Sequence, residues 1–597
     1  MSFKRPNKIN SQQRIRRLDH KLETAHAQIR KVQTLRLWTG AVTIAGFVFS
    51  AIWPQLHLSI PTLVFFLAVF PLLVRISRNW SRFHRHLRTW RDFEARQENR
   101  RNGSWKAHLV PDLSSLDTYG VAADLDLFGS KSLFTQIDET FSAGGAVRLA
   151  SMMLADPSLE TIAARQALLK DLSASRWFFL RFRLSNPSLE EARFSSNELL
   201  NSIGSFPVPS LRLKLMLAGV LAAWFISVGL IVFYPAVWAL FIAANVLFLL
   251  SLGTLMSKGE GVLHYFSDLA PSFDVLESKR APLAVARICT SIRADQPARR
   301  IRRFDYPLAA LTVESHPLVY LLVNFFLPWS AFFSFILVNQ VAGVRRNLEK
   351  FFAELEEVEA LASLAVLTTD QTSVFPSVGS SRVLSGHEFF HPLIDKTKRV
   401  ANDFGFAGGT SSSGVDDSEK MILLTGSNMS GKSTFLRTLG INQVLANMGA
   451  PVFASMFATF PYRVRSCIRV SDSIEQGFSY FYAEVQRLKL VLAAADKAPP
   501  VLYLIDEIFR GTNNRERLIG SQSVIKHLLT TPAIGFITTH DLELTQIADG
   551  RKQVHNYHFR DEARDNQMHF SYSIHDGPSP TTNALKIMKQ AGLPIEG

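Results

Sequence analysis

A short run of residues in this chain has the composition and spacing needed to hold a phosphate group. From Gly426 to Ser433 the sequence is GSNMSGKS, a G-x-x-x-x-G-K-S pattern that follows the apolar stretch Met421–Thr425. The glycines let the backbone curl, so that successive N–H groups face phosphate oxygens. The pattern predicts that Lys432 reaches the β- and γ-phosphates of a nucleotide and that Ser433 holds Mg²⁺. The candidate phosphate-binding residues are Gly426, Ser427, Asn428, Met429, Ser430, Gly431, Lys432, Ser433 and Thr434.

Two carboxylates follow a second apolar stretch. Residues Val501–Glu507 are VLYLIDE, a pattern typical of a buried parallel strand that carries charge at its carboxyl end. Because ligands of open α/β sheets bind at this edge, we expect Asp506 to stand behind the metal and Glu507 to orient or deprotonate a water molecule. A third stretch, Ala533–Thr539, ends at His540, which we expect near the γ-phosphate. An α/β sheet must bring these strands side by side.

Four blocks in this order resemble the ATPase domain of the MutS mismatch-repair family. They are Thr425–Thr434, Ser471–Glu484, Asp506–Thr512 and Thr539–Asp541. The resemblance implies a P-loop ATPase domain related to the ABC ATPases, with ATP and Mg²⁺ as cofactors. It also implies a homodimer formed through the ATPase domains, in which Ser479 of one subunit contacts the γ-phosphate bound to the other. The implied catalytic residues are then Glu507, His540 and Ser479, and the implied metal-binding residues are Ser433 and Asp506.

The resemblance extends upstream of the ATPase domain. Leu125–Phe128 and Glu356–Ala365 resemble the beginning and the returning helix of the all-α MutS core, or lever, domain. His391, followed by a proline, resembles the short motif before the nucleotide domain, and Val400–Asn402 stands where the family surrounds the adenine base. The expected fold class is thus an α/β P-loop NTPase of the ABC type, C-terminal to an all-α MutS core.

One pair of long apolar runs precedes that core, and a second pair interrupts it. Leu37–Trp53 and Leu56–Val74 form one pair, and Leu215–Phe233 and Ala236–Met256 form a second. Their lengths suit a bilayer, and they predict two transmembrane helical hairpins, with buried helices of a soluble core as the alternative. A fifth run, Pro317–Val338, is predicted to be buried or interfacial, because a fifth crossing would place the ATPase on the wrong side.

The distribution of charge sets the expected location. The chain has a net charge of +14, and basic residues concentrate on both flanks of the first pair of runs. The positive-inside rule then predicts a multi-pass inner-membrane protein with its termini and ATPase in the cytoplasm, and with membrane lipid as a partner. Only Cys289 and Cys467 occur, so a disulfide framework is not indicated. The cluster Arg293–Arg303 could contact phosphate, nucleic acid or solvent.

The predicted organisation follows from these patterns. The expected parts are a basic segment 1–36, a transmembrane hairpin 37–74, a basic helical connector 75–119, a first core part 120–210, a second hairpin 211–258, a second core part 259–385 and the ATPase domain 386–597.

The predicted function is that of a membrane-anchored, MutS-like ATPase without a mismatch-recognition domain. We expect it to hydrolyse ATP at composite dimer sites and to transmit the change to the core and hairpins. One alternative is a membrane-tethered repair or recombination protein that binds DNA, mismatched or not. Another is an ABC-type transporter, although the apolar runs contain no polar track for a substrate.

Overall fold

The computed structural model describes most of the chain in separate stretches, which form two compact units. The first unit takes in residues 1–101, 176–281 and 285–354, and the second takes in 102–175, 282–284 and 355–597. The described residues are 11–53, 59–101, 119–185, 195–204, 269–311, 329–369, 372–406, 419–427, 429–469, 480–509, 513–564 and 567–580, with single positions between them.

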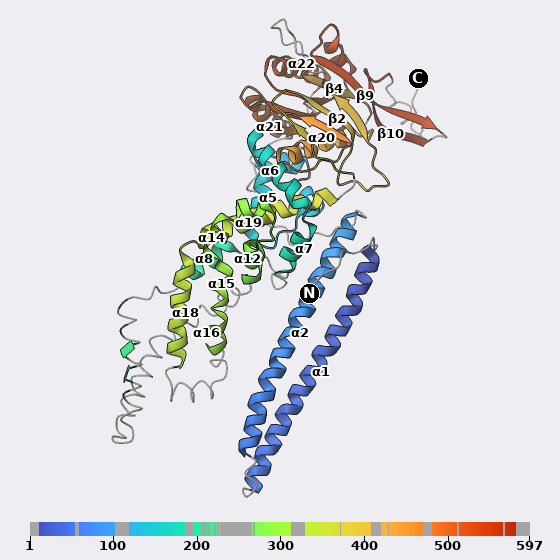
Figure 1. Ribbon diagram of the computed structural model, residues 1–597. Helices are drawn as coiled ribbons and strands as arrows, with labels where there is room; N and C mark the ends of the chain where they lie inside the picture. The colour runs from blue at the N-terminus through green and yellow to red at the C-terminus, as the bar shows by residue number, and fades with distance from the viewer. Residues whose placement is uncertain are drawn as a thin grey trace. The chain divides into compact units, whose positions relative to one another are not determined.

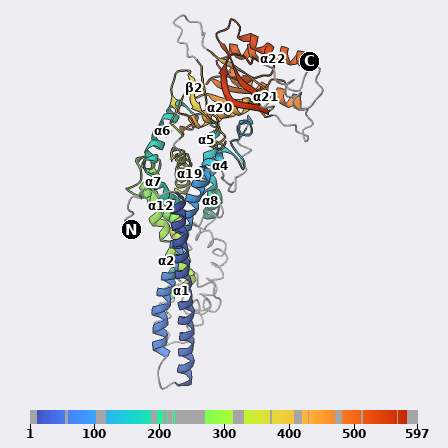
Figure 2. The ribbon, with the colours of Figure 1, turned by 90° about the vertical axis from the view of Figure 1, so that its right-hand side faces the viewer.

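The first unit contains a long antiparallel helical hairpin. Helices α1 (Ser11–Ile52) and α2 (Ser59–Arg101) lie side by side along their length (Figures 1 and 2). Near their charged ends they bury Leu18 and Leu87 against each other, together with neighbouring indole rings. An ion pair of 3.1 Å between Arg91 and Asp19 ties the same region.

This hairpin corrects the transmembrane prediction. Within the described residues, every helix falls short of the length or the apolar character that a bilayer crossing requires. The reason is visible in α1, which begins as a charged helix and turns apolar only at Leu37, then ends at Ile52. Its apolar part is about 24 Å long at 1.5 Å per residue, whereas the hydrocarbon core is roughly 30 Å thick.

The predicted fold class required two such hairpins and is therefore wrong in that respect, and the predicted multi-pass inner-membrane location is wrong with it. The second pair of runs, Leu215–Phe233 and Ala236–Met256, lies outside the described residues except for single positions.

The remaining helices of the first unit are short and packed through aromatic side chains. Phe273 contacts Phe351 at a ring separation of 6.4 Å, and Phe266 contacts Phe304 at 6.1 Å. Of the fifth apolar run, the described part is helical, and Leu337 is buried there. The helices are α7 (Arg176–Leu184), α8 (Ser196–Gly204), α12 (Ala270–Glu277), α14 (Thr290–Asp295), α15 (Pro297–Arg302), α16 (Asp305–Leu311) and α18 (Trp329–Arg345). Two more, α13 (Leu283–Ile288) and α19 (Leu348–Ala365), have residues in both units.

The second unit is built on two sheets. The larger has the order β10-β9-β4-β8-β7-β6, parallel except for the β9–β10 pair, and the smaller has the order β1-β5-β2-β3. Helices α20, α21 and α22 flank the larger sheet (Figure 1). The strands are β1 (Ser377–Val378), β2 (Leu384–Phe389), β3 (Asn402–Gly405), β4 (Met421–Thr425), β5 (Met456–Thr459), β6 (Arg463–Cys467), β7 (Val501–Asp506), β8 (Ile534–Thr538), β9 (Val554–Arg564) and β10 (Gln567–Asp576). The helices are α3 (Val121–Asp124), α4 (Leu133–Ile137), α5 (Ala143–Leu154), α6 (Leu159–Ser173), α20 (Lys432–Asn447), α21 (Tyr480–Ala495) and α22 (Asn514–Thr530), with 3₁₀ turns η5 (Val366–Thr369) and η7 (Leu542–Ala548).

The central strands form where the sequence is apolar without interruption. Every residue of β4, β7 and β8 is buried, as expected for parallel strands covered on both faces. The register pairs Leu424 with Thr538 and Asp506 with the same Thr538, so the carboxyl ends of these three strands meet. This edge carries the motifs that the sequence singled out.

A buried carboxylate joins the first helices of this unit to the sheet. Asp124, at the end of α3, is fully buried and accepts hydrogen bonds from the Ser466 hydroxyl at 2.7 Å and the Arg469 backbone N–H at 2.8 Å. The Arg487 guanidinium on α21 donates to it at 2.7 Å. This carboxylate therefore connects α3 to β6, to the residue Arg469 that follows β6 closely, and to α21.

Gly535 in β8 shows how tightly the central strands pack. A Cβ atom there would lie 2.1 Å from the backbone oxygen of Tyr503, whose ring is completely buried. We expect Gly535→Ala to lower the free energy of unfolding by about 2 kcal/mol, because the strands must move apart. Urea denaturation followed by circular dichroism measures this loss. Gly405→Ala is the control, because its Cβ would contact Ser385 at an ordinary 3.6 Å and should have little effect.

Candidate nucleotide-binding site

The phosphate-binding loop connects β4 to α20 at the carboxyl edge of the sheet. Gly426 has φ 146° and Gly431 has φ 111°, backbone conformations that side chains rarely permit. Lys432, the first residue of α20, is buried and its Nζ donates to the carbonyl oxygens of Gly426 at 2.9 Å and Ser427 at 2.8 Å. The ammonium group therefore lies inside the curl of the loop, next to the helix N-terminus that favours an anion.

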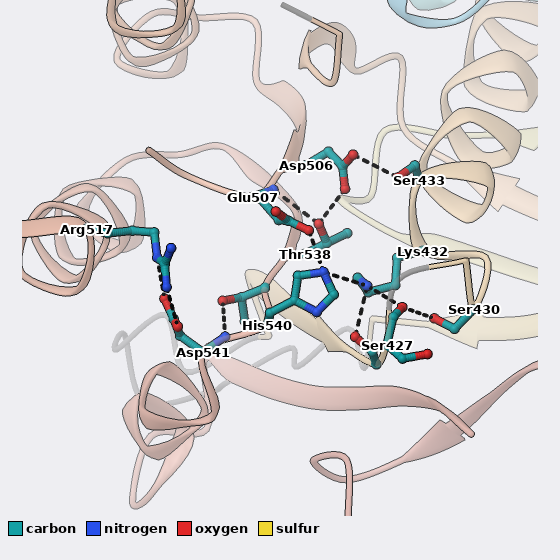
Figure 3. A network of polar contacts seen from close by, with 12 residues as sticks. Ser427, Ser430, Lys432, Ser433, Asp506, Glu507, Arg517, Thr538, His540 and Asp541 are labelled. Carbon is teal, nitrogen blue, oxygen red and sulfur yellow. Dashed lines mark hydrogen bonds and ion pairs between the residues drawn. The ribbon is translucent and has the colours of Figure 1, made fainter. Parts of the chain in front are cut away.

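Asp506 is held at both of its carboxylate oxygens. The Ser433 hydroxyl donates to Oδ2 at 2.7 Å, and the Thr538 hydroxyl donates to Oδ1 at 2.6 Å (Figure 3). A serine hydroxyl beside a carboxylate is a hard oxygen pair of the kind that Mg²⁺ prefers. The described residues contain no group of three or more His, Cys, Asp or Glu side chains able to hold a metal alone.

Glu507 and His540 meet next to the lysine. Glu507 adopts a left-handed φ of 58°, and its backbone N–H donates to the Thr538 hydroxyl at 3.1 Å. His540 Nε2 lies 2.6 Å from Glu507 Oε1 and 3.3 Å from Lys432 Nζ. One ring nitrogen cannot donate to a carboxylate and accept from an ammonium group at once. The shorter contact is the hydrogen bond, so His540 donates to Glu507, and Lys432 keeps its loop carbonyls.

A pocket opens beside the loop. Its volume is about 460 Å³, and it is lined by both sheets and by α20. The Tyr572 ring lies close to the loop, since a Cβ on Gly431 would be 3.2 Å from its Cδ1. Asn402 fixes this part of β10, because its amide donates to the Tyr572 carbonyl at 3.0 Å and accepts from Ile574 N–H at 2.8 Å. The lining residues are Phe389, His391, Ile394, Lys398, Arg399, Val400, Asn402, Gly431, Thr434, Phe435, Thr438, Phe559 and Tyr572.

His391 contributes an uncharged ring to this pocket. Burial lowers its pKa to about 4, so the imidazole is neutral at neutral pH. Its Nδ1 accepts the Leu393 backbone N–H at 3.2 Å, and the proton is therefore on Nε2. The pocket wall next to the phosphate loop thus carries no charge at this position.

Comparison with known proteins finds relatives of the C-terminal part of the chain. Residues 422–596 match the family described as MutS domain V. Curated relatives named "DNA mismatch repair protein MutS" include those of Shouchella clausii (29% identical, covering 43% of this chain and 29% of the relative) and Leuconostoc mesenteroides (28% identical, covering 42% and 29%). The relative from Chlamydia pneumoniae is 29% identical, covering 43% of this chain and 31% of its own length. The chain therefore carries a MutS domain V over residues 422–596. The matches span under a third of the relatives' length.

The MutS domain brings together most of the residues that the sequence singled out. Lys432, Ser433, Asp506, Glu507 and His540 lie within one connected set of polar contacts (Figure 3). Met429 lies at the tip of the loop, with 82% of its surface exposed. Asn428 and Ser479 lie outside the described residues, so their predicted roles stay predictions.

Two contributors to the MutS domain's site were missed from the sequence. Thr538 joins Asp506 to the Glu507 backbone, yet the only signal for it is its place at the end of an apolar stretch. Tyr572 enters the pocket from β10, far along the chain, and no local pattern marks it. Val400 and Asn402, which the resemblance placed near the adenine base, do line the pocket.

Proposed function

We propose that this chain binds ATP with Mg²⁺ and hydrolyses it to ADP and phosphate. The observation that carries the proposal is the alignment of Lys432, Ser433 and Asp506 along one edge of the sheet, next to a pocket large enough for a nucleoside. Ser433 and Asp506 would hold Mg²⁺, which neutralises charge on the β- and γ-phosphates when bound. Phosphoryl transfer needs mainly positioning and electrostatic stabilisation, and these residues supply both.

Each side chain has a separate task in this proposal. When ATP binds, Lys432 gives up its hydrogen bonds to the loop carbonyl oxygens and donates to phosphate oxygens instead. Glu507 orients the attacking water and accepts its proton, while the β-phosphate oxygen leaves with the electron pair of the broken bond. His540 holds Glu507 through its 2.6 Å contact. Hydrolysis that requires Mg²⁺ and stops on adding EDTA is the direct test, and purified protein without such activity would refute the proposal.

The pocket would take the nucleoside. We expect Tyr572→Ala to weaken ATP binding about tenfold, because removing an aromatic ring from a base-binding wall costs roughly 1–3 kcal/mol. Titration with a fluorescent ATP analogue measures the change. Tyr572→Phe keeps the ring and is the control, expected to bind as wild type does. An unchanged affinity for Tyr572→Ala would place the base elsewhere.

We further propose that two chains share each ATP site, with Ser479 contributed by the opposite subunit. Exposed large side chains support this: Met429 in the loop is 82% exposed, and Phe481 and Tyr482 at the start of α21 are 37% and 44% exposed. Such surface is typical of an interaction site. Light scattering should show a dimer that is more populated with ATP than with ADP.

The contacts of Asp124 support a second step, in which closure of the two ATPase domains on ATP is transmitted to α3 and the helices that follow.

DNA is a second candidate partner. The relatives' names describe DNA mismatch repair, and the first unit carries the cluster Arg293–Arg303. Within this cluster Arg302 pairs with Asp274 and Arg300 lies 3.7 Å from Asp295, so part of its charge is already neutralised. Salt-dependent DNA binding that is lost when the cluster is mutated would support this function.

A further inference from the structure

An arginine and an aspartate form a two-pronged ion pair beside the catalytic residues. Arg517, on the first turns of α22, donates from Nε to Asp541 Oδ2 and from Nη2 to Asp541 Oδ1, both at 2.9 Å (Figure 3). Both side chains are about three-quarters covered, with 27% and 26% exposed. A bidentate ion pair, in which two guanidinium N–H groups donate to the two oxygens of one carboxylate, is among the strongest and most directional of ion pairs.

This pair fixes the turn that carries His540. Asp541 is the next residue along the chain, and its backbone N–H donates to the Thr539 hydroxyl at 3.0 Å. The turn 539–541 is thus stabilised by its own hydrogen bond, and the ion pair of Asp541 with Arg517 attaches it to α22. His540 points from this turn to Glu507, so its position depends on a contact made outside the phosphate loop.

The same helix also supports the turn that carries Glu507. Phe509 has a left-handed φ of 62°, and its ring lies over Gly520 of α22, where a Cβ would be 2.6 Å from Cε2. Positions 517 and 520 are three apart and share one face of a helix. One face of α22 therefore contacts both turns, His540 through Arg517 and Glu507 through Phe509.

We propose that Arg517 is a positioning residue for ATP hydrolysis, holding His540 against Glu507 through Asp541. This rests on the proposed function, since it concerns the same site. Arg517 acts through the turn 539–541 and not on the nucleotide. Its hydrogen bonds to Asp541 raise the pKa of Arg517, with a smaller contribution from the charge of Glu507, so the cation persists at every working pH.

Steady-state kinetics of four variants test this assignment. Arg517→Ala and Asp541→Ala should each lower kcat by 10- to 100-fold, since a misplacement of about 1 Å in a catalytic group can cost that much. KM for ATP should stay within about threefold, because neither residue belongs to the phosphate loop or the pocket. The double variant should be no slower than the slower single one, because both changes remove one interaction. Arg517→Lys keeps the charge without the two-pronged geometry and should fall between wild type and Arg517→Ala.

Lys526→Ala is the matched control, because Lys526 is an exposed cation on the same helix. It should leave kcat unchanged. Thermal unfolding of every variant accompanies the kinetics, and if Arg517→Ala does not fold, Arg517→Lys and Asp541→Ala decide the matter. The proposal is overturned if kcat stays within threefold of wild type, or if kcat falls only together with ATP affinity. Wild-type protein without Mg²⁺-dependent hydrolysis would overturn the proposed function itself, a result distinct from unchanged variant kinetics.

Discussion

Glu507→Gln is expected to stop steady-state ATP turnover while leaving ATP bound. The amide has nearly the shape of the carboxylate and can still contact His540, but it cannot accept a proton from water. Loss of a general base costs about 100- to 10,000-fold in kcat. Because Lys432 and Asp506 are untouched, the affinity for ATP should remain near that of wild type.

Two further variants make this experiment decisive. Glu543→Gln carries the same chemical change at an exposed carboxylate of η7 and should hydrolyse ATP as wild type does. Lys432→Ala should lose ATP binding itself, because the buried ammonium group is the cation of the phosphate loop. Quenched-flow hydrolysis and equilibrium binding separate the three behaviours. Unimpaired turnover by Glu507→Gln would remove Glu507 from the catalytic assignment.

Asp124→Ala is expected to be the most destabilising single change in the second unit. It leaves the Arg487 guanidinium, the Ser466 hydroxyl and the Arg469 backbone N–H without the acceptor that they share. Breaking a buried ion pair by removing one partner costs about 3–5 kcal/mol. Asp124→Asn keeps an oxygen acceptor and should lose less.

The control for this experiment is Asp496→Ala. Asp496 lies 3.4 Å from His527 with 53% of its side chain exposed, and exposed pairs of this kind contribute little. Urea denaturation followed by circular dichroism measures all three variants. A loss below about 1 kcal/mol for Asp124→Ala would show that the arginine finds water or another acceptor in the folded protein.

Much of the candidate site could be predicted because its residues are local in sequence. The loop Gly426–Ser433 follows one uninterrupted apolar strand, and Asp506 and Glu507 lie at the carboxyl end of another. Because the carboxyl ends of buried parallel strands meet at one edge of a sheet, the sequence could place them together. Thr538, Tyr572 and Asp124 could not be predicted in the same way. Their roles depend on which strands and helices become neighbours, and that information is spread over the whole second unit.

The hairpin prediction failed for a different physical reason. Apolar length was measured along the sequence, whereas a bilayer is crossed by the apolar part of one continuous helix. In α1 that part begins at Leu37 and ends with the helix at Ile52, while the charged half of the helix packs against α2. The apolar run in the sequence and the apolar part of the helix nearly coincide, and both are too short: about 24 Å against a hydrocarbon core of roughly 30 Å.

The resting contacts of Lys432 determine which ligands can enter the phosphate loop. The ammonium group already donates hydrogen bonds to two carbonyl oxygens, so a ligand that replaces them must offer stronger acceptors than neutral oxygens. Anionic oxygens meet that condition, because charge-assisted hydrogen bonds are about twice as strong as neutral ones. If the pocket takes the base as proposed, we expect adenosine, which has no phosphate, to leave the contacts of Lys432 with the loop unchanged. Selection for a polyphosphate chain is thus exerted by the backbone of the loop, independently of how well the base fits.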